Sequence, residues 1–258
     1  DPSTSAVLVA LAVTLAAGLA TALGSLLVIF AKGPNPRLLA FGLAFAGGAM
    51  VYVSLTEIFA KSVASFTLAY DARLGFALAT FAFLAGLLLV MAIDMLVPNP
   101  HDTLTTDDPS LREHNREYIR RVGLPTAAAI TAHTFPEGLA TFFATLGNPA
   151  VGLPLAFAIA IHNIPEGIAI AVPVYYATHN KAWAFGASLL SGLAEPLGAI
   201  IGFTLLSRYL NDAVFGAVFG IIAGIMVFLA IDELLPAAKR YEKGHETVYG
   251  LVSGMGVL

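Results

Sequence analysis

The sequence predicts an all-α membrane protein with eight transmembrane helices in a single transmembrane domain that covers residues 1–258. Of its 258 residues, 58% are apolar and only 12% are charged, and the mean hydropathy is +0.82. A soluble domain carries about 25% charged residues, so this chain lacks the polar surface that a protein needs in water. Each span takes about 20 mostly apolar residues, which leaves no room for a soluble catalytic domain beside the spans.

Eight apolar runs follow one another, separated by short polar segments. They fall at about 6–30, 37–60, 73–98, 124–147, 152–178, 182–207 and 213–238, with a last run that begins near Val248. No basic residue precedes the first run, which is too long for the apolar part of a signal peptide, so we interpret it as a retained span. The last run ends at Leu258 after about ten residues, too few to cross, and a truncated last helix is expected.

The positive charges predict which side of the membrane each loop faces. Ten Lys and Arg residues fall on one side of the predicted spans and three on the other, and cytoplasmic loops carry the excess. Both termini are therefore expected to face outward. The one long connection, at about 99–123, mixes acidic residues with arginines and is expected to be a solvated cytoplasmic loop.

Two pairs of segments repeat within the chain, and each pair lies in spans that cross in opposite directions. The segment 48–57, GAMVYVSLTE, aligns with 224–233, GIMVFLAIDE. Likewise 133–138, HTFPEG, aligns with 162–167, HNIPEG. Inverted repeats with proline in corresponding helices are typical of secondary transporters, which bind their substrate near the membrane midplane.

The ionisable residues inside the predicted spans are acidic or histidine, and none is Lys or Arg. A charged side chain at the bilayer centre costs about 2.5 to 3.5 kcal/mol, and a bound cation would compensate the acidic ones. Four of these carboxylates lie near span ends: Glu57 toward the outside, and Asp94, Asp232 and Glu233 toward the cytoplasm. They could be protonated or reach the membrane interface. Alternatively, they could relay a cation at the outer and the cytoplasmic mouth of a transport path. The others are His133, Glu137, His162, Glu166 and Glu195.

The two copies of His-x-x-Pro-Glu-Gly favour a shared ion. In each copy His and Glu are four residues apart, so both side chains project from one helix face. Pro136 and Pro165 each remove a backbone donor and are expected to interrupt their helices, which is tolerated where backbone lines a cavity. Gly138 and Gly167 let a neighbouring helix approach closely.

The residue types also narrow the choice of ion. Imidazole suits zinc, copper, iron and nickel, and carboxylate and amide oxygens suit harder ions, so the mixed set fits a divalent first-row metal, with zinc first. Calcium and magnesium prefer shells of oxygen alone. The chain has no cysteine, which argues against copper(I) and excludes a thiolate site.

Three motifs together resemble the fourth, fifth and sixth helices of the ZIP (Zrt-, Irt-like) metal transporters: HTFPEG at 133–138, HNIPEG at 162–167 and SGLAEPLG at 191–198. The likeness extends over essentially the whole chain and is greatest for a bacterial branch of the family. It implies eight spans in a three-plus-two-plus-three arrangement, location in a bacterial inner membrane, and a binuclear metal centre between those three helices. It also implies an elevator motion of the central helices against the others.

The resemblance further implies which residues hold the two ions. One ion would be held by His133, Glu137, His162, Glu166 and Glu195. The second would be held by Asn163, with Glu137, Glu166 and Glu195 as bridges. This chain departs from the bacterial pattern at Thr134, where that branch usually has Asn, so the second ion is expected to bind more weakly or to keep a water.

Transport of divalent cations into the cytoplasm is the function that these residues favour, with zinc first and iron, manganese, cobalt and cadmium as further candidates. The chain contains no phosphate-binding loop of an ATPase and needs no prosthetic group. An intramembrane protease would want His-Glu-x-x-His, and an iron hydroxylase more histidines than the spans contain. A metal-selective channel or sensor shares the ligands and stays open as an alternative. The net charge of −4 excludes a nucleic-acid partner, whereas a homodimer stays open beside the metal ions and the lipid bilayer.

Overall fold

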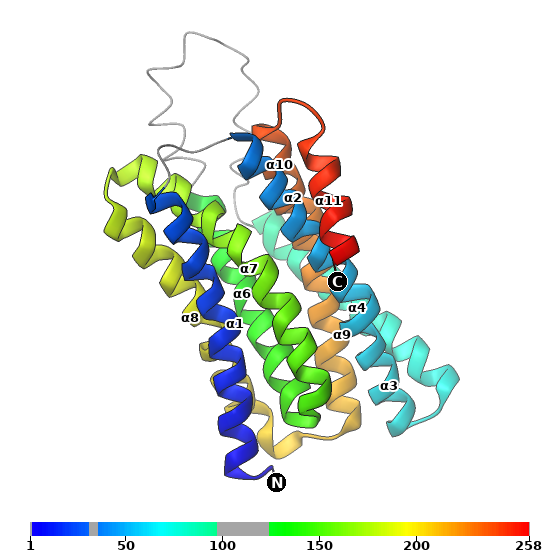
Figure 1. Ribbon diagram of the computed structural model, residues 1–258. Coiled ribbons are helices and arrows are strands. Elements are labelled where there is room, and N and C mark those ends of the chain that lie inside the picture. The colour runs from blue at the N-terminus through cyan, green and yellow to red at the C-terminus, as the bar shows by residue number, and fades with distance from the viewer. Residues whose placement is uncertain (1, 31–35, 97–123, 258) are drawn as a thin grey trace.

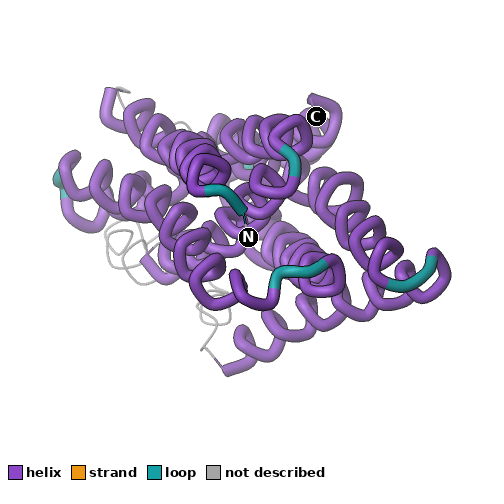
Figure 2. Tube along the Cα trace, turned by 90° about the horizontal axis from the view of Figure 1, so that it is seen from below, coloured by secondary structure: helices purple, strands orange, loops and turns teal. Residues whose placement is uncertain are grey.

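The computed structural model describes residues 2–30, 36–96 and 124–257, and within these ranges every regular element is a helix. The predicted all-α class is confirmed. Figure 2 shows that helices joined by short loops make up the described chain. The elements are α1 (Thr4–Phe30), α2 (Pro36–Val53), η1 (Ser54–Ile58), α3 (Phe59–Ala69), α4 (Ala72–Leu96), α6 (Leu124–Gly147), α7 (Pro149–Thr178), α8 (Lys181–Leu206), η5 (Ser207–Tyr209), α9 (Asp212–Leu229), η6 (Ala230–Leu234), α10 (Leu235–Tyr241) and α11 (Glu246–Val257).

Six helical stretches among the described residues are long and apolar enough to cross a membrane. Two of them are composite, because α2, η1 and α3 form one stretch and α9, η6 and α10 form another. Helices α6 and α11 lie at the places of the fourth and eighth predicted spans. The predicted loop at about 99–123 lies outside the described residues.

The second predicted span is longer than its apolar run indicates. The run was expected to end near residue 60, but the helix continues to Ala69, so Lys61 lies in a helix and not in a loop. Polar residues are accommodated there because they find partners. The hydroxyl of Ser62 is buried and donates to the carbonyl of Gly216 over 2.6 Å, and Lys61 donates to Glu57 over 3.1 Å.

A π-helical segment interrupts the second and the seventh predicted spans at corresponding places. The segments η1 and η6 occupy equivalent positions of the repeated sequences 48–57 and 224–233. Single π turns inside α-helices are uncommon and often mark functional sites. The helices that carry the other repeat continue as α-helix through Pro136 and Pro165, so the expected interruption at these prolines is wrong and the irregular backbone lies in the other pair of spans.

The helices form two bundles (Figure 1). The central bundle consists of α1, α6, α7 and α8, which pack against one another; the outer bundle consists of α2, α3, α4, α9, α10 and α11. The two bundles meet chiefly where α2 packs on α7 and where α6 packs on α9. Ring contacts strengthen the second of these junctions, because Phe143 of α6 stacks edge-on against Phe215 of α9.

Glycines allow the closest helix crossings, and those of the outer bundle occur in equivalent pairs. A Cβ on Gly48 of α2 would lie 2.2 Å from the carbonyl oxygen of Leu251 in α11. A Cβ on Gly224, the equivalent residue of α9, would lie 2.0 Å from the carbonyl oxygen of Phe83 in α4. The two repeats therefore share their packing contacts as well as their sequence, as an inverted repeat requires.

The ends of α7 set the position of its polar residues within the central bundle. Asn148 is extended and its side chain accepts from the amide of Ala150, with Pro149 at the first helical position. The helix ends at His179, which adopts the left-handed conformation with a φ of 52°. The motif at 162–167 therefore lies near the middle of α7, far from both ends.

Candidate metal centre

Side chains from three helices of the central bundle bring polar groups together in a fully buried position. Glu137 of α6, His162, Asn163 and Glu166 of α7, and Glu195 of α8 each have 0% of their surface exposed. Lys, Glu, Arg and Asp are almost never fully buried unless they are paired. Three carboxyl groups buried side by side need a compensating positive charge, and a divalent cation is the compact way to supply it.

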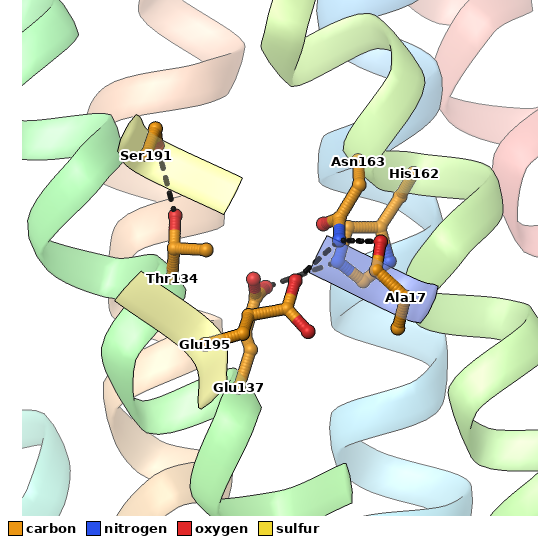
Figure 3. Close-up of polar contacts among 7 residues, drawn as sticks. All are labelled: Ala17, Thr134, Glu137, His162, Asn163, Ser191 and Glu195. Carbon is orange, nitrogen blue, oxygen red and sulfur yellow. Dashed lines mark hydrogen bonds and ion pairs between the residues drawn. The ribbon is translucent and has the colours of Figure 1, made fainter. Parts of the chain in front are cut away.

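Glu137, His162 and Glu166 form the core of this site. Each offers one ligand atom, and these atoms all lie within 4.8 Å of one another. His162 Nε2 lies 3.0 Å from Glu137 Oε1, an interaction that joins α7 to α6 (Figure 3). The arrangement of one imidazole and two carboxylates suits a divalent first-row metal.

Asn163 and Glu195 extend the site toward α8 and α1. The Asn163 side-chain amide donates to Glu195 Oε1 over 2.5 Å and to the carbonyl oxygen of Ala17 over 2.9 Å (Figure 3). These two hydrogen bonds fix the orientation of the Asn163 side chain, because its amide nitrogen donates both of them. Asn163 Oδ1 and Glu195 Oε2 are buried and have no hydrogen-bond partner among the described residues. Both oxygens are therefore available to a cation.

Thr134 lies beside this group on α6, and 1% of its surface is exposed. Its hydroxyl is 3.4 Å from the hydroxyl of Ser191 on α8 (Figure 3). His133 belongs to α6, but its side chain lies outside the described residues. Of the predicted ligand set, the structure thus brings together Glu137, His162, Asn163, Glu166 and Glu195, with Thr134 next to them.

The predicted mouth residues lie apart from this cluster. Glu57 is in η1, with 57% of its side chain exposed, and forms an ion pair with Lys61. Asp232 and Glu233 are half-buried in η6. Asp94 lies in the last turn of α4, and its side chain is outside the described residues. The π segments η1 and η6 therefore carry three of these four residues.

Two groups of the site were missed from the sequence, the carbonyl of Ala17 and the hydroxyl of Ser191. A backbone carbonyl leaves no signature in a side-chain pattern. The one available signal is the glycine that follows the motif glutamate on α6, since a Cβ on Gly138 would lie 2.0 Å from the carbonyl oxygen of Glu195 in α8. Glycine at this position lets α8 approach α6 and brings Glu195 to the site.

The fold and the site define a class of protein: a multi-pass helical membrane protein whose central bundle buries a group of His and Glu side chains that could hold a cation. The sequence model described as "ZIP Zinc transporter" matches residues 113–258. A protein named "Zinc transporter ZupT" from Xanthomonas axonopodis pv. citri (strain 306) is 75% identical over 250 residues, 97% of this chain and 92% of that protein. Proteins of the same name are similar in Neisseria meningitidis serogroup B (strain ATCC BAA-335 / MC58), at 67% over 100% of this chain and 96% of that protein, and in Lysinibacillus sphaericus (strain C3-41), at 46% over 98% and 96%.

The chain belongs to the ZIP family of divalent-metal transporters. The resemblance drawn from the three motifs is confirmed, and so is the prediction of a transporter in place of an enzyme.

Proposed function

We propose that the chain carries zinc and related divalent cations across the membrane through the buried group of Glu137, His162 and Glu166. The observation that carries this proposal is that three ligand atoms from two helices converge within 4.8 Å at full burial. The described residues that the structure brings to this site include no Lys or Arg. The names of the relatives support zinc as the first cargo.

Two ions share the site in this proposal. The first is held by His133, Glu137, His162, Glu166 and Glu195, and the second by Asn163 with bridging carboxylates from Glu137, Glu166 and Glu195. The open oxygens of Asn163 and Glu195 support the second position. Because Thr134 offers only a neutral hydroxyl, the second ion binds more weakly than the first.

In this proposal the protein lies in the inner membrane of a bacterium with both chain termini on the outer side. It moves the cation into the cytoplasm. The distribution of basic residues supports this orientation. The end where α7 joins α8 (upper end in Figure 1) holds the start of α2 with Arg37, the start of α8 with Lys181, and the end of α10 with Lys239, Arg240 and the following Lys243. The opposite end holds the start of α4 with Arg73 and η5 with Arg208, and Lys61 lies in α3, which leads toward that end. An inward-negative membrane potential then drives uptake of the divalent cation without ATP.

The mouth carboxylates act as weak successive sites on this route. Glu57 serves the outer side, and Asp94, Asp232 and Glu233 serve the cytoplasmic side. The placement of η1 and η6 at equivalent but antiparallel positions supports two such mouths, one on each side of the buried centre. The single transmembrane domain 1–258 and the homodimer stay predictions.

Uptake into proteoliposomes tests the function. Purified protein is reconstituted, and uptake of zinc, cadmium, iron, manganese and cobalt is followed side by side, with protein-free liposomes as the blank. We expect uptake that saturates with metal concentration and is most efficient for zinc. A rate that rises linearly with metal over the whole range favours the channel alternative, and uptake equal to the blank for every metal contradicts transport.

A further inference from the structure

The inverted relation between the two repeats extends into the central bundle. A Cβ on Gly18 of α1 would lie 2.2 Å from the carbonyl oxygen of Gly192 in α8, and a Cβ on Gly192 would lie 2.1 Å from the carbonyl oxygen of Gly18. Each of the two glycines therefore lies against the backbone carbonyl of the other. Helices α1 and α8 therefore cross at equivalent points, and Gly18 is the counterpart of Gly192.

A second pair of contacts shows which residue of α1 corresponds to Glu195. A Cβ on Gly138 would lie 2.0 Å from the carbonyl oxygen of Glu195, and a Cβ on Gly167 would lie 1.8 Å from the carbonyl oxygen of Thr21. Gly138 and Gly167 are the same position of the two His-x-x-Pro-Glu-Gly copies. Thr21 of α1 is therefore the counterpart of Glu195 of α8: α1 and α7 form one half of the centre, and α8 and α6 form the other.

The hydrogen bonds of the site follow the same register. Asn163 of α7 donates to the carbonyl of Ala17, one turn before Thr21. Thr134, at the equivalent position of α6, contacts Ser191, one turn before Glu195. Each half of the centre therefore carries one threonine: Asn163 faces α1 and is paired with Thr21 in the half made by α7 and α1, and Thr134 is paired with Glu195 in the half made by α6 and α8.

The Thr21 hydroxyl is a buried polar group that the described protein does not use. Thr21 has 0% of its surface exposed, and its Oγ1 has no hydrogen-bond partner among the described residues. Buried threonines inside helices commonly bond to the carbonyl one turn earlier. Thr14 of the same helix, also 0% exposed, does so over 2.8 Å to Ala10.

We propose that the Thr21 hydroxyl is a further ion-contacting group of the centre, opposite Glu195, and that it determines how well the site accepts oxygen-preferring cations relative to zinc. This inference rests on the proposed metal transport. Thr21 packs between two of the three helices that supply carboxylates: its backbone contacts Gly167 of α7, which follows Glu166, and its Cβ lies 3.3 Å from the place of a Cβ on Gly192 of α8, one turn before Glu195.

The chemistry of a hydroxyl explains the expected selectivity. A neutral oxygen is a hard, weak ligand that suits manganese, whereas imidazole accounts for much of the preference for zinc. Removal of the hydroxyl leaves the imidazole and the carboxylates in place. Manganese, which depends more on oxygen ligands, therefore loses more binding free energy than zinc does.

The test compares Thr21→Val, which keeps the shape, with Thr21→Ser, which keeps the hydroxyl, and with Thr14→Val, which removes an equally buried hydroxyl from the same helix. Binding of Zn²⁺ and of Mn²⁺ to each purified full chain is measured by calorimetry, and competition of the two ions for uptake is measured in proteoliposomes. Thr21→Val should weaken Mn²⁺ binding about tenfold and Zn²⁺ binding about twofold or less, the scale of one weak neutral contact. Thr14→Val should leave both affinities unchanged, and Thr21→Ser should recover most of the Mn²⁺ affinity that Thr21→Val loses.

Other results overturn the inference. No loss for either ion shows that the hydroxyl does not contact the ion, and equal losses for both ions show that it does not determine selectivity. A Thr14→Val protein that loses Mn²⁺ binding as Thr21→Val does shows a packing effect. If the wild-type protein neither binds nor transports metal, the proposed function itself fails; a wild-type protein that transports, beside an unaltered Thr21→Val variant, overturns only the role of Thr21.

Discussion

The central and the outer bundle are built by the same inverted repeat and packed through the same kind of glycine contact, yet among the described side chains only those of the central bundle include fully buried ionisable groups. Glu137, His162, Glu166 and Glu195 are all fully buried there, whereas the buried polar residues of the outer bundle within the described chain are hydroxyl residues, Ser54, Ser62 and Thr247. Three carboxylates of the outer bundle, Glu57, Asp232 and Glu233, lie in the π segments, and Glu57 is exposed.

The comparison shows that different residues determine the packing of the helices and the position of the charged groups. The glycine contacts recur in equivalent pairs and determine how closely the helices cross, so they account for the shape of both bundles. The departures from equivalence, such as Glu195 against Thr21 and Asn163 against Thr134, determine where charge accumulates. The repeat therefore accounts for the packing of the helices, and a few unequal residues account for the buried acidic group that we propose as the cation site.

The largest expected effect comes from removing a buried carboxylate of the central bundle. Glu166→Ala or Glu137→Ala should abolish zinc uptake and weaken zinc binding more than about 100-fold, because a direct ligand is worth at least as much as the outer-shell groups that orient ligands. Zinc binding to each variant is measured by calorimetry, and zinc uptake is measured in proteoliposomes. Size-exclusion chromatography verifies that each variant is folded.

Glu57→Gln is the matched control in the outer bundle. It removes one carboxylate from a position where 57% of the side chain is exposed, and it should leave the zinc affinity of the centre unchanged. Near-normal uptake by a well-folded Glu166→Ala or Glu137→Ala protein would falsify the central site.

The next effect is on stability and concerns the helix crossing that both halves share. Gly192→Ala places a Cβ 2.1 Å from the carbonyl oxygen of Gly18, so α1 and α8 must separate, at a cost of about 1 to 3 kcal/mol for overpacking. Gly186→Ala, in the same helix, has no atom within 4 Å of the added Cβ. It should stabilise the protein by up to about 1 kcal/mol, because Ala favours the helix over Gly. Thermal unfolding in detergent compares the two; equal midpoints would show that the crossing tolerates a methyl group.

Much of the fold could be predicted from the sequence because composition and apolar runs are properties of the chain alone. The stacking of Glu137 and of Glu166 with a histidine four residues earlier also follows from helix geometry. The extension of the second span to Ala69 could not be predicted, since it depends on Ser62 finding the carbonyl of Gly216 in a helix far along the chain. The π segments depend likewise on tertiary packing.

The candidate site was predicted less completely than the fold. Glu195 was singled out as an ionisable residue inside a span, but its place among the ligands came from the resemblance of a motif, because a lone glutamate in an apolar span indicates no partner. The carbonyl of Ala17 and the hydroxyl of Thr21 could not be found in this way: a backbone group has no residue type, and one threonine in an apolar helix is common. The hydrogen bond from Asn163 identifies the carbonyl of Ala17, and the three-dimensional equivalence of α1 and α8 singles out the hydroxyl of Thr21 that we propose as an ion contact.

A smaller effect concerns turnover and sharpens the contrast between buried and peripheral carboxylates. Asp232→Asn together with Glu233→Gln should lower the maximal uptake rate severalfold while the zinc affinity of the centre stays within about twofold, because weak mouth sites change the passage of the ion more than its binding. Uptake at saturating zinc and calorimetry separate the two quantities. An unchanged rate would mean that these side chains are simply solvated ends of the helix.

The smallest expected effect comes from making the two halves of the centre more alike at Thr134. Asn163 presents its oxygen to the site because its nitrogen donates to Glu195 and to the carbonyl of Ala17. Ser191 occupies the place of Ala17 in the other half and already contacts Thr134. In Thr134→Asn, the new amide nitrogen can therefore donate toward Ser191 while its oxygen, a better ligand than a hydroxyl, turns toward the second ion. Zinc titration by calorimetry should give two unequal sites in the wild type, and the weaker one should tighten severalfold in the variant while the stronger one changes little. Two equally occupied sites in the wild type at low zinc, or a weaker site that does not respond to Thr134→Asn, would show that something other than the hydroxyl limits the second ion.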